Sequence, residues 1–312
     1  MSLSQTHSNW LISLEEIEKS VGNTPLHSFS RYLEKANNVE VLAKLEWKQI
    51  GKSVKARAAF SIIKDAMVSG ALYPGKELLD ATSGNTGIAY ASICSKLGIQ
   101  TTLCIPENAS NERKEILKSL GAHLIYTSKF ELTEGAQNYA KTLYEQNPNR
   151  YFYADQYSNN RNWKAHYYGT AEEIFEQTQG KVTHFISGLG TTGTFVGTVR
   201  KLKELNPAIQ AIALQPDIAL HGLEGWKHLE SVGAPKIYDP TLADDVMMIS
   251  TEEAYSLMRQ VAKSDDLFLS PSSAANLLGA FKVAEKIGSG VIVTVLPDDA
   301  EKYSDVTKTI LR

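Results

Sequence analysis

Apolar residues along the chain gather in short runs that alternate with longer amphipathic stretches. The short runs are mostly apolar, and they cover residues 39–45, 78–81, 101–105, 123–126, 183–187, 208–214 and 291–296, the last of which is continuous and rich in β-branched residues. The longer stretches have helical spacing of apolar positions, and they cover residues 87–97, 111–120, 132–145, 194–205, 251–262 and 274–287. Continuous apolar runs are typical of strands buried on both faces of a parallel sheet. The alternation therefore predicts an α/β protein with mostly parallel sheets and helices on both sides.

The length of 312 residues favours two domains. The polar stretch at residues 157–163 is the best candidate for a boundary between them. At the N-terminus the pattern predicts an arm and then a short helix over residues 14–18, with Ser13 as its N-cap. The sequence Gly-Asn-Thr-Pro-Leu at residues 22–26 predicts a turn that leads into an extended segment.

Composition and charge narrow the class of protein. An apolar content of 43% is enough for a large core, and a formal net charge of −3 argues against binding to nucleic acid or a membrane surface. No apolar run reaches the ~18 residues of a membrane span, and the polar N-terminus does not resemble an export signal. We interpret Cys94 and Cys104, both in apolar runs, as buried thiols of a cytoplasmic protein. The seven histidines show no ligand spacing, so we expect no metal.

Three segments at predicted strand ends carry the candidate chemistry. Lys55 follows the first strand and opens a helix-forming segment, where a lone lysine is usually a solvated side chain. Residues 80–87 and 187–194 are rich in glycine, serine and threonine, and each precedes a helix, so both loops offer backbone N–H groups to an anion. In parallel sheets such loops lie at the carboxyl ends of the strands. An amine beside two anion-binding loops indicates a cofactor with a phosphate and a reactive carbonyl, such as pyridoxal phosphate.

The second loop has a rival interpretation. Residues 188–193 also match the pattern G-x-G-x-x-G, and Asp217 follows the next predicted strand, as in a dinucleotide-binding fold. Residues 82–87 favour the pyridoxal phosphate interpretation, because the carboxylate of an amino-acid substrate needs several N–H and hydroxyl donors at once. A nicotinamide-dependent dehydrogenase remains an alternative at this point.

The motifs resemble those of the cysteine synthase (O-acetylserine sulfhydrylase) and cystathionine β-synthase family. Four motifs have the order and spacing of that family, namely Ser53-Val54-Lys55-x-Arg57, Thr82-Ser83-Gly84-Asn85-Thr86-Gly87, Gly190-Thr191-Thr192-Gly193-Thr194 and Ser272-Ser273. The resemblance extends from residues 21–26 to residues 296–298. Three further segments are most similar to the B-type (M-type) cysteine synthases, namely Thr191-Thr192, Asp155-Gln156-Tyr157 and Ala165-His166-Tyr167.

The resemblance implies fold type II of the pyridoxal phosphate enzymes, the fold of the tryptophan synthase β-subunit. We therefore expect two three-layer α/β domains with mostly parallel sheets and the cofactor between them. A smaller, mobile N-terminal domain would cover residues 46–155, and residues 1–45 plus 156–312 would form the domain that binds the cofactor phosphate. The resemblance also implies a homodimer.

The resemblance further implies a role for each motif residue. Lys55 would form the internal aldimine and remove the α-proton of the substrate. The other cofactor contacts would be Asn85 beside the ring hydroxyl, Ser272 at the pyridine nitrogen, and Gly190, Thr191, Thr192, Gly193 and Thr194 around the phosphate. The substrate carboxylate would contact Thr82, Ser83, Gly84, Thr86 and Gln156. Lys227, which matches a basic position of the family, or the adjacent His228 would accept an anionic leaving group.

The implied reaction is β-replacement on an O-activated L-serine, either O-acetylserine or O-phosphoserine. Sulfide would add to an aminoacrylate intermediate and give L-cysteine. A related enzyme with another nucleophile, such as homocysteine, is an alternative, and so is a degenerate relative that only binds the cofactor.

The chain departs from the family pattern at several positions. Lys52 and Ala56 replace a glycine and an aspartate on either side of Lys55, and Ser270-Pro271 replaces a glycine and an aliphatic residue. These changes bear on the substrate more than on the cofactor, because the motif residues are retained. We interpret Lys52 as a surface charge and His166 as a packed or hydrogen-bonded histidine.

Overall fold

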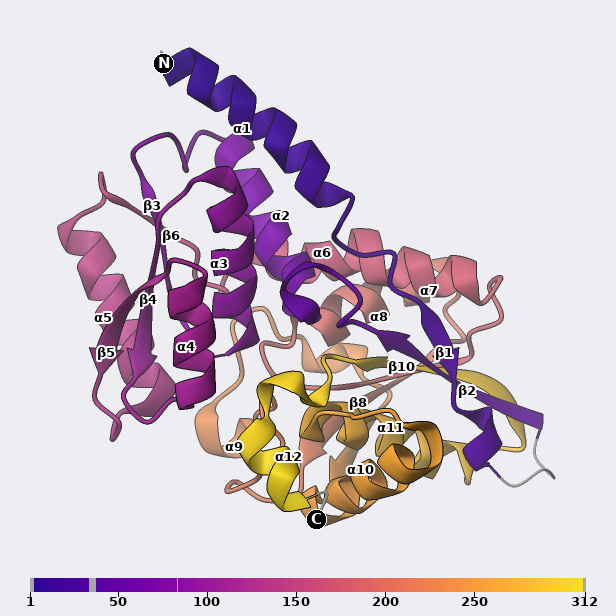
Figure 1. Ribbon diagram of the computed structural model, residues 1–312. Helices are drawn as coiled ribbons and strands as arrows, with labels where there is room; N and C mark the ends of the chain where they lie inside the picture. Colours follow the sequence, from indigo (N-terminus) through magenta and orange to yellow (C-terminus); the bar gives the residue numbers. More distant parts are fainter. Residues whose placement is uncertain (1–2, 34–37, 83, 311–312) are drawn as a thin grey trace. The chain divides into compact units, whose positions relative to one another are not determined.

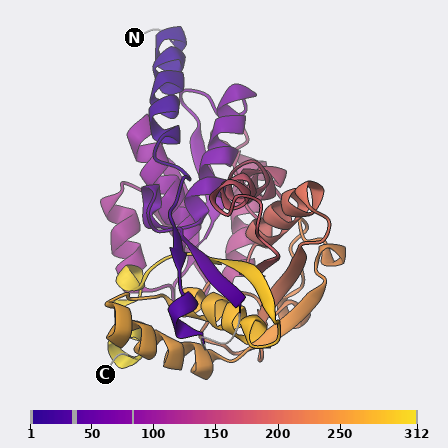
Figure 2. The ribbon, with the colours of Figure 1, turned by 90° about the vertical axis from the view of Figure 1, so that its right-hand side faces the viewer.

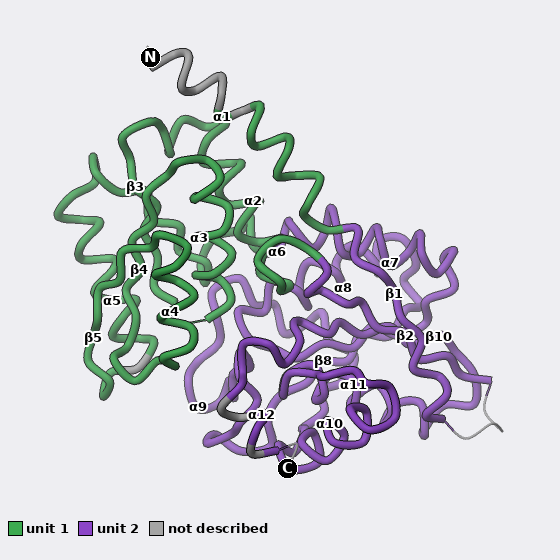
Figure 3. The backbone as a smooth tube through the Cα atoms, in the orientation of Figure 1, with its two compact units in different colours: residues 1–22, 49–162 green, residues 23–48, 163–312 purple. Residues whose placement is uncertain are grey.

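The computed structural model describes residues 3–33, 38–82 and 84–310, and it confirms the predicted alternation of strands and helices (Figures 1 and 2). The chain forms two compact units (Figure 3). Unit 1 contains residues 1–22 and 49–162, and unit 2 contains residues 23–48 and 163–312. The last division therefore lies within the polar stretch that the sequence analysis singled out.

Unit 1 is built on a parallel four-stranded sheet with the order β5-β4-β3-β6. Its strands are β3 (Glu77–Ala81), β4 (Thr101–Pro106), β5 (His123–Thr127) and β6 (Tyr151–Tyr153). Its helices are α1 (Leu3–Glu18), η2 (Ile50–Lys52), α2 (Lys55–Val68), α3 (Asn85–Leu97), α4 (Asn111–Ser119) and α5 (Leu132–Gln146), and α6 (Asn160–Ala165) begins in it.

Each face of this sheet has its own apolar core, because successive strand residues point to opposite sides. On β3, Leu78 packs with helices α1, α2, α3 and α4, whereas Leu79 packs with α5. Helices thus cover both faces, as Figure 1 shows for α3 and α5. Unit 1 therefore has the three layers that the sequence predicts.

Helix α1 is longer than predicted. It begins at Leu3, so Ser13 lies inside the helix, and its prediction as an N-cap was wrong. Trp10, Leu14 and Ile17 form a buried stripe on the helix and join the core of unit 1. This contact explains why residues 1–22 lie with unit 1, whereas the sequence analysis assigned that segment to the other domain.

Unit 2 is built on a six-stranded sheet with the order β1-β2-β10-β7-β8-β9, in which β1 alone is antiparallel to its neighbour. Its strands are β1 (Leu26–Ser28), β2 (Asn38–Leu45), β7 (His184–Gly188), β8 (Gln210–Pro216), β9 (Asp245–Ile249) and β10 (Ser289–Leu296). Its main helices are η3 (His166–Thr170), α7 (Ala171–Gln177), α8 (Gly193–Leu205), α9 (Leu229–Val232), α10 (Thr251–Asp265), α11 (Pro271–Ala284) and α12 (Ser304–Ile310). Short 3-10 turns are η1 (Ser30–Tyr32), η4 (Pro240–Leu242) and η5 (Ala300–Lys302). Helices α7 and α8 lie on one side of the sheet and α10 and α11 on the other (Figures 1 and 2).

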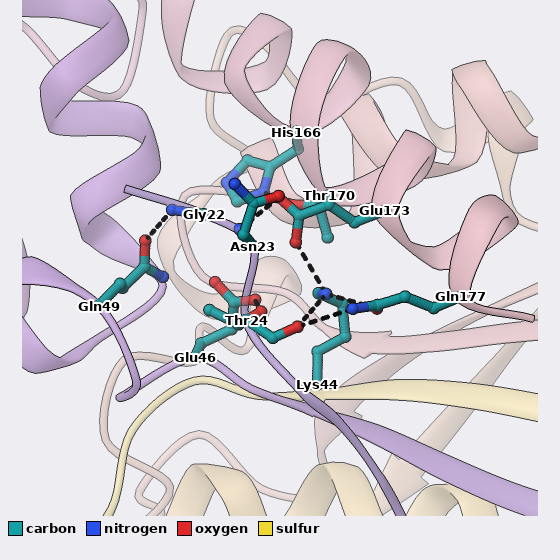
Figure 4. A network of polar contacts seen from close by, with 10 residues as sticks. All are labelled: Gly22, Asn23, Thr24, Lys44, Glu46, Gln49, His166, Thr170, Glu173 and Gln177. Atoms are coloured by element: carbon teal, nitrogen blue, oxygen red, sulfur yellow. Dashed lines mark hydrogen bonds and ion pairs between the residues drawn. The ribbon is translucent and has the colours of Figure 1, made fainter. Parts of the chain in front are cut away.

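A buried cluster of polar side chains surrounds Thr24, near the first residues of unit 2 (Figure 4). The Lys44 ammonium donates to the Thr24 carbonyl at 2.8 Å and to Gln177 Oε1 at 2.9 Å, and it pairs with Glu173 Oε2 at 2.8 Å. The Thr24 hydroxyl donates to Glu46 Oε1 at 2.6 Å. Lys44 and Glu46 are fully buried, and buried charges are tolerated when they are paired and hydrogen-bonded. The cluster therefore holds the predicted turn at Thr24 against β2 and α7.

Candidate active site

Lys55 is the first residue of helix α2 in unit 1, and it is half-buried. The turn before it contains Gly51 at φ 68° and Lys52 at φ 48°, both in the left-handed region. A Cβ on Gly51 would lie 3.2 Å from the Cα of Ala89 in α3, so the turn packs closely on that helix. This contact fixes the start of α2 and with it Lys55. The Lys52 side chain is exposed, as expected for a surface charge.

Most of the predicted carboxylate-binding residues lie together in unit 1. Thr82 follows β3, Gly84 is the N-cap of α3, and Thr86 lies in the first turn of that helix. The Thr86 hydroxyl donates to Gln156 Oε1 at 2.6 Å, and the Gln156 amide donates to the carbonyl of Ala81 at 3.5 Å. Thr82, Thr86 and Gln156 are all buried. A helix N-terminus lined by hydroxyl and amide groups suits a carboxylate.

Two other predicted residues belong to the same loop. Asn85, which the sequence predicts beside the cofactor ring, is the first residue of α3 and is half-buried. Ser83 lies outside the described residues. Its predicted contact with the substrate carboxylate stays a prediction.

Asp80 is a buried carboxyl group to which the sequence analysis gave no role. It is 1% exposed near the end of β3, where Oδ1 accepts from the Ala81 N–H at 2.8 Å and Oδ2 from the Gln156 N–H at 3.4 Å. Burial raises the pKa of the Asp80 carboxyl to about 7, and the nearby Asp155 adds to this rise. The signal in the sequence was an acidic residue inside an apolar run. Asp80 connects the two segments that contain the predicted carboxylate-binding residues.

We expect Asp80 to make the stability of the protein depend on pH. Its pKa is higher in the folded chain than in the unfolded one, so between about pH 4 and 7 the folded chain keeps a proton that the unfolded chain has released. The free energy of unfolding therefore falls as the pH rises through this window. In Asp80→Asn this contribution is absent. The free energy of unfolding of the variant, taken relative to that of the wild type, should therefore rise by about 2 kcal/mol between about pH 5 and 8. Urea unfolding at several pH values measures this difference.

Asp244→Asn is the matched control for this measurement. The Asp244 carboxylate accepts from the Ala211 N–H at 2.7 Å, as Asp80 does from a strand N–H, but it is also paired with Lys203 at 2.7 Å. Removing a paired charge should destabilise the protein near neutral pH. A parallel pH profile for Asp80→Asn and the wild type would contradict the raised pKa.

The predicted phosphate loop of unit 2 runs from the end of β7 to the start of α8. The Gly188 N–H donates to Asn276 Oδ1 at 2.7 Å, and the Leu189 N–H donates to the carbonyl of Leu214 at 3.0 Å. The Lys227 N–H donates to the Leu189 carbonyl at 2.7 Å, so the segment that contains Lys227 lies against the loop. Three neighbouring elements therefore hold the loop in one conformation.

The loop fits a phosphate group. A Cβ on Gly190 would lie 2.0 Å from the carbonyl oxygen of Gly225, so glycine alone fits there. Thr192 lies in the left-handed region at φ 69°, and helix α8 begins at the next residue, Gly193. A left-handed residue before a helix N-terminus presents backbone N–H groups to an anion. The Thr192 hydroxyl is buried and, within the described part of the chain, has no hydrogen-bond partner. A phosphate oxygen at this helix end would satisfy it.

Thr194 in the same loop is held by a buried histidine. His166 lies in the π-helical turn η3 and is 2% exposed. Its Nδ1 is 2.9 Å from the Thr170 hydroxyl and its Nε2 is 3.3 Å from the Thr194 hydroxyl. The expectation of a hydrogen-bonded histidine is confirmed. His166 orients Thr194, a contact that the linear pattern of the sequence does not reveal.

Ser272 lies in the first turn of helix α11, and the departures from the family pattern beside it have a structural reason. The Ser270 hydroxyl caps the helix by accepting from the Ser273 N–H at 3.2 Å, and Pro271 occupies the first helical position, which suits proline. The Ser270 and Ser272 hydroxyls are 3.3 Å apart, and the Ser273 hydroxyl donates to the Asp298 carbonyl at 2.6 Å. The substitutions therefore stabilise the helix end that carries Ser272.

The described residues give no support for a reactive cysteine, a metal site or a membrane-spanning helix. Cys94 and Cys104 are buried free thiols, and burial raises the pKa of each to about 12. In the described ranges no group of three or more His, Cys, Asp or Glu residues could hold a metal ion. No helix among the described residues has the length and apolar character to cross a membrane.

Comparison with known proteins gives matches along almost the whole chain. The family described as pyridoxal-phosphate dependent enzyme matches residues 17–298. A cysteine synthase of Aquifex aeolicus is 46% identical over 295 residues, which is 93% of this chain and 90% of that protein. Cysteine synthase B of Pseudomonas aeruginosa is 39% identical over 289 residues, which is 92% of this chain and 95% of that protein.

The fold also matches a solved structure. The crystal structure of a cysteine synthase of Entamoeba histolytica has a TM-score of 0.87 and 34% sequence identity. The match covers 93% of this chain and 89% of that one. Sequence and fold therefore point to the same group of relatives.

Proposed function

Because the chain belongs to the family of pyridoxal-phosphate-dependent enzymes, we propose that it converts an O-activated L-serine and sulfide into L-cysteine. The observation that carries the proposal lies in unit 1. There the helix that begins with Lys55 packs on α3. Thr86 lies in the first turn of α3, Thr82 shortly precedes that helix, and Gln156 reaches its start through a hydrogen bond with Thr86. The family match sets aside the nicotinamide interpretation of residues 188–193.

Pyridoxal phosphate, when bound, supplies a carbonyl that captures the amine of the substrate and a ring that withdraws electrons from its Cα. Lys55 would hold the cofactor and, after release, remove the proton from Cα with Nζ. Thr82, Gly84, Thr86 and Gln156 would bind the substrate carboxylate, since their hydroxyl, amide and N–H groups lie at the start of α3.

The phosphate loop of unit 2 would anchor the cofactor. The buried Thr192 hydroxyl and the N-terminus of α8 support this role, and His166 would keep the Thr194 hydroxyl in place. The remaining cofactor contacts proposed are those of Asn85 with the ring hydroxyl and of Ser272 with the pyridine nitrogen. Fixed donors of this kind bind a phosphate without reorganisation.

The proposed reaction balances without an oxidant or a reductant. The bond between Cβ and oxygen breaks, the leaving group departs with the electron pair, and sulfide forms the new bond to Cβ. Lys55 returns to Cα the proton that it removed. Acetate leaves when the donor is O-acetylserine, and inorganic phosphate leaves when it is O-phosphoserine.

The test is cysteine formation by the purified protein with pyridoxal phosphate and sulfide. We expect turnover with O-acetylserine or O-phosphoserine and none with L-serine, since hydroxide is a poor leaving group. Homocysteine in place of sulfide serves as the second nucleophile. Turnover with homocysteine and not with sulfide, or no turnover of either donor by protein that has bound the cofactor, would contradict the proposal.

Lys227 is proposed as a contact for the leaving group, because its backbone lies against the phosphate loop. The substitution Lys227→Ala should then reduce kcat/KM for O-phosphoserine about tenfold and leave O-acetylserine nearly unchanged, since phosphate carries the larger charge. His228→Ala tests the adjacent alternative. The His228 Nδ1 already lies 2.7 Å from the Ser231 hydroxyl, so we expect this variant to keep its activity with both donors. Equal losses for both donors would remove Lys227 from the site.

Two features of the cellular protein complete the proposal. We propose a homodimer, which the family resemblance supports and which light scattering in solution will test. We also propose a cytoplasmic location, supported by the two buried free thiols.

A further inference from the structure

Asp80 lies near the end of β3, two residues before the loop of unit 1 that we propose to bind the substrate carboxylate. Its carboxyl oxygens accept hydrogen bonds from the N–H groups of Ala81 and Gln156. Ala81 directly precedes the loop, and the Gln156 side chain is hydrogen-bonded to Thr86. The Asn162 side-chain amide donates to the Gln156 carbonyl at 2.7 Å, so the backbone of Gln156 is held on both sides. Asp80 thus contacts both segments that contain the residues proposed to bind the carboxylate.

We propose that Asp80 is a proton-linked positioning residue, which takes up a proton when the carboxylate of the substrate binds to the loop. This inference rests on the proposed function of the loop. It adds to that function a coupling between substrate affinity and pH. Asp80 would act through the loop and would not touch the substrate.

The groups around Asp80 favour protonation of its carboxyl group. The titratable groups that face it are Tyr90 of α3, Cys104 of β4, and Tyr153, Asp155 and Tyr157 on and after β6. None of these groups is a cation. The Tyr90 hydroxyl and the two backbone N–H groups lower the pKa of Asp80 by hydrogen bonding, but the effect of burial is larger. Burial already raises its pKa to about 7.

A bound carboxylate adds another negative charge near the buried Asp80 and the half-buried Asp155. The loop begins two residues after Asp80, and Gln156 contacts both the loop and Asp80. In a buried site two like charges repel strongly, and protonation of one of them removes the repulsion. Protonated Asp80 keeps its acceptor oxygens for the two backbone N–H groups, so the loop retains its geometry when the proton enters.

The proposal predicts that carboxylate affinity falls as the pH rises above 7. Binding that takes up one proton weakens by at most about tenfold per pH unit. A suitable probe is 3-hydroxypropanoate, which has the carboxylate and hydroxyl of serine but lacks the amine that reacts with the cofactor. Isothermal titration of the holoenzyme in two buffers of different ionisation enthalpy measures the proton uptake directly.

We expect the wild type to take up a fraction of one proton near pH 8 and to bind the probe several-fold more weakly at pH 9 than at pH 7. In Asp80→Asn proton uptake should vanish, and the affinity should change less than about twofold over the same range. The control Asp244→Asn should behave as the wild type, because its carboxylate lies in unit 2 and is paired with Lys203. The neutral amide 3-hydroxypropanamide should show no proton uptake with any variant.

The outcomes separate this inference from the proposed function. Probe binding without proton uptake by the wild type would overturn the role of Asp80 and leave the carboxylate loop intact. No probe binding at all, in an enzyme that still turns over O-acetylserine, would overturn the carboxylate role of the loop and the inference with it. Because the wild type alone gives the proton count, the test does not depend on the folding of Asp80→Asn.

Discussion

Replacing Lys55 by alanine should lower kcat/KM for cysteine formation by about 10³-fold or more. The expected loss combines the two proposed roles, because the same amine would hold the cofactor and move the Cα proton. A positioned general base alone contributes about 10²- to 10⁴-fold. The fold should survive, since Lys55 is the first residue of α2 and alanine favours a helix. Borohydride reduction followed by peptide mass measurement should find the cofactor on Lys55 in the wild type and on no residue in the variant.

Lys52→Gly is the matched control for this experiment. Lys52 is another lysine three positions earlier, but its side chain is exposed and its φ of 48° suits glycine better than lysine. We expect this variant to keep its activity, to keep the covalent cofactor and to be at least as stable as the wild type. A similar loss in both lysine variants would indicate a general effect of positive charge in this segment. An active Lys55→Ala would contradict the catalytic assignment.

The sequence predicts the elements that are buried on both sides better than the exposed ones. The strands β4 and β10 are confirmed within two residues, because β-branched apolar runs of this kind fit a central parallel strand. The strand β9 was missed. It lies at the edge of its sheet, and Val246 and Met248 are both exposed, so its pattern lacks the continuous burial of β4.

The polar loops of the candidate site could be predicted because their chemistry is local. A glycine-rich turn before a helix presents N–H groups whatever surrounds it, and Gly193 does begin α8. The contacts between distant segments could not be predicted in the same way. His166 meets Thr194 through a π-helical turn, and Asp80 meets Gln156 through the pairing of β3 with β6. Neither contact leaves a periodic signal in the sequence.

Replacing Gly190 by alanine should weaken cofactor binding by about two orders of magnitude. The added Cβ would lie 2.0 Å from the carbonyl oxygen of Gly225, and this neighbour is backbone, which cannot rotate away as a side chain can. The phosphate loop and the segment before Lys227 must therefore move apart, which strains the bond between the Lys227 N–H and the Leu189 carbonyl. Overpacking of this kind costs about 1–3 kcal/mol, and 3 kcal/mol corresponds to a factor of about 100 in affinity.

Fluorescence titration of the apoprotein with pyridoxal phosphate measures this effect, and Gly288→Ala is its control. Gly288 also lies in unit 2, but a Cβ there would meet no atom of the described residues within 4 Å. The control should bind the cofactor as the wild type does, because it leaves the loop unchanged. Pyridoxal without its phosphate should bind Gly190→Ala and the wild type with similar affinity, since we propose that the loop contacts only the phosphate of the cofactor. If the variant lost affinity for both compounds equally, the clash would act on the fold of unit 2 and the loop would not be the phosphate site.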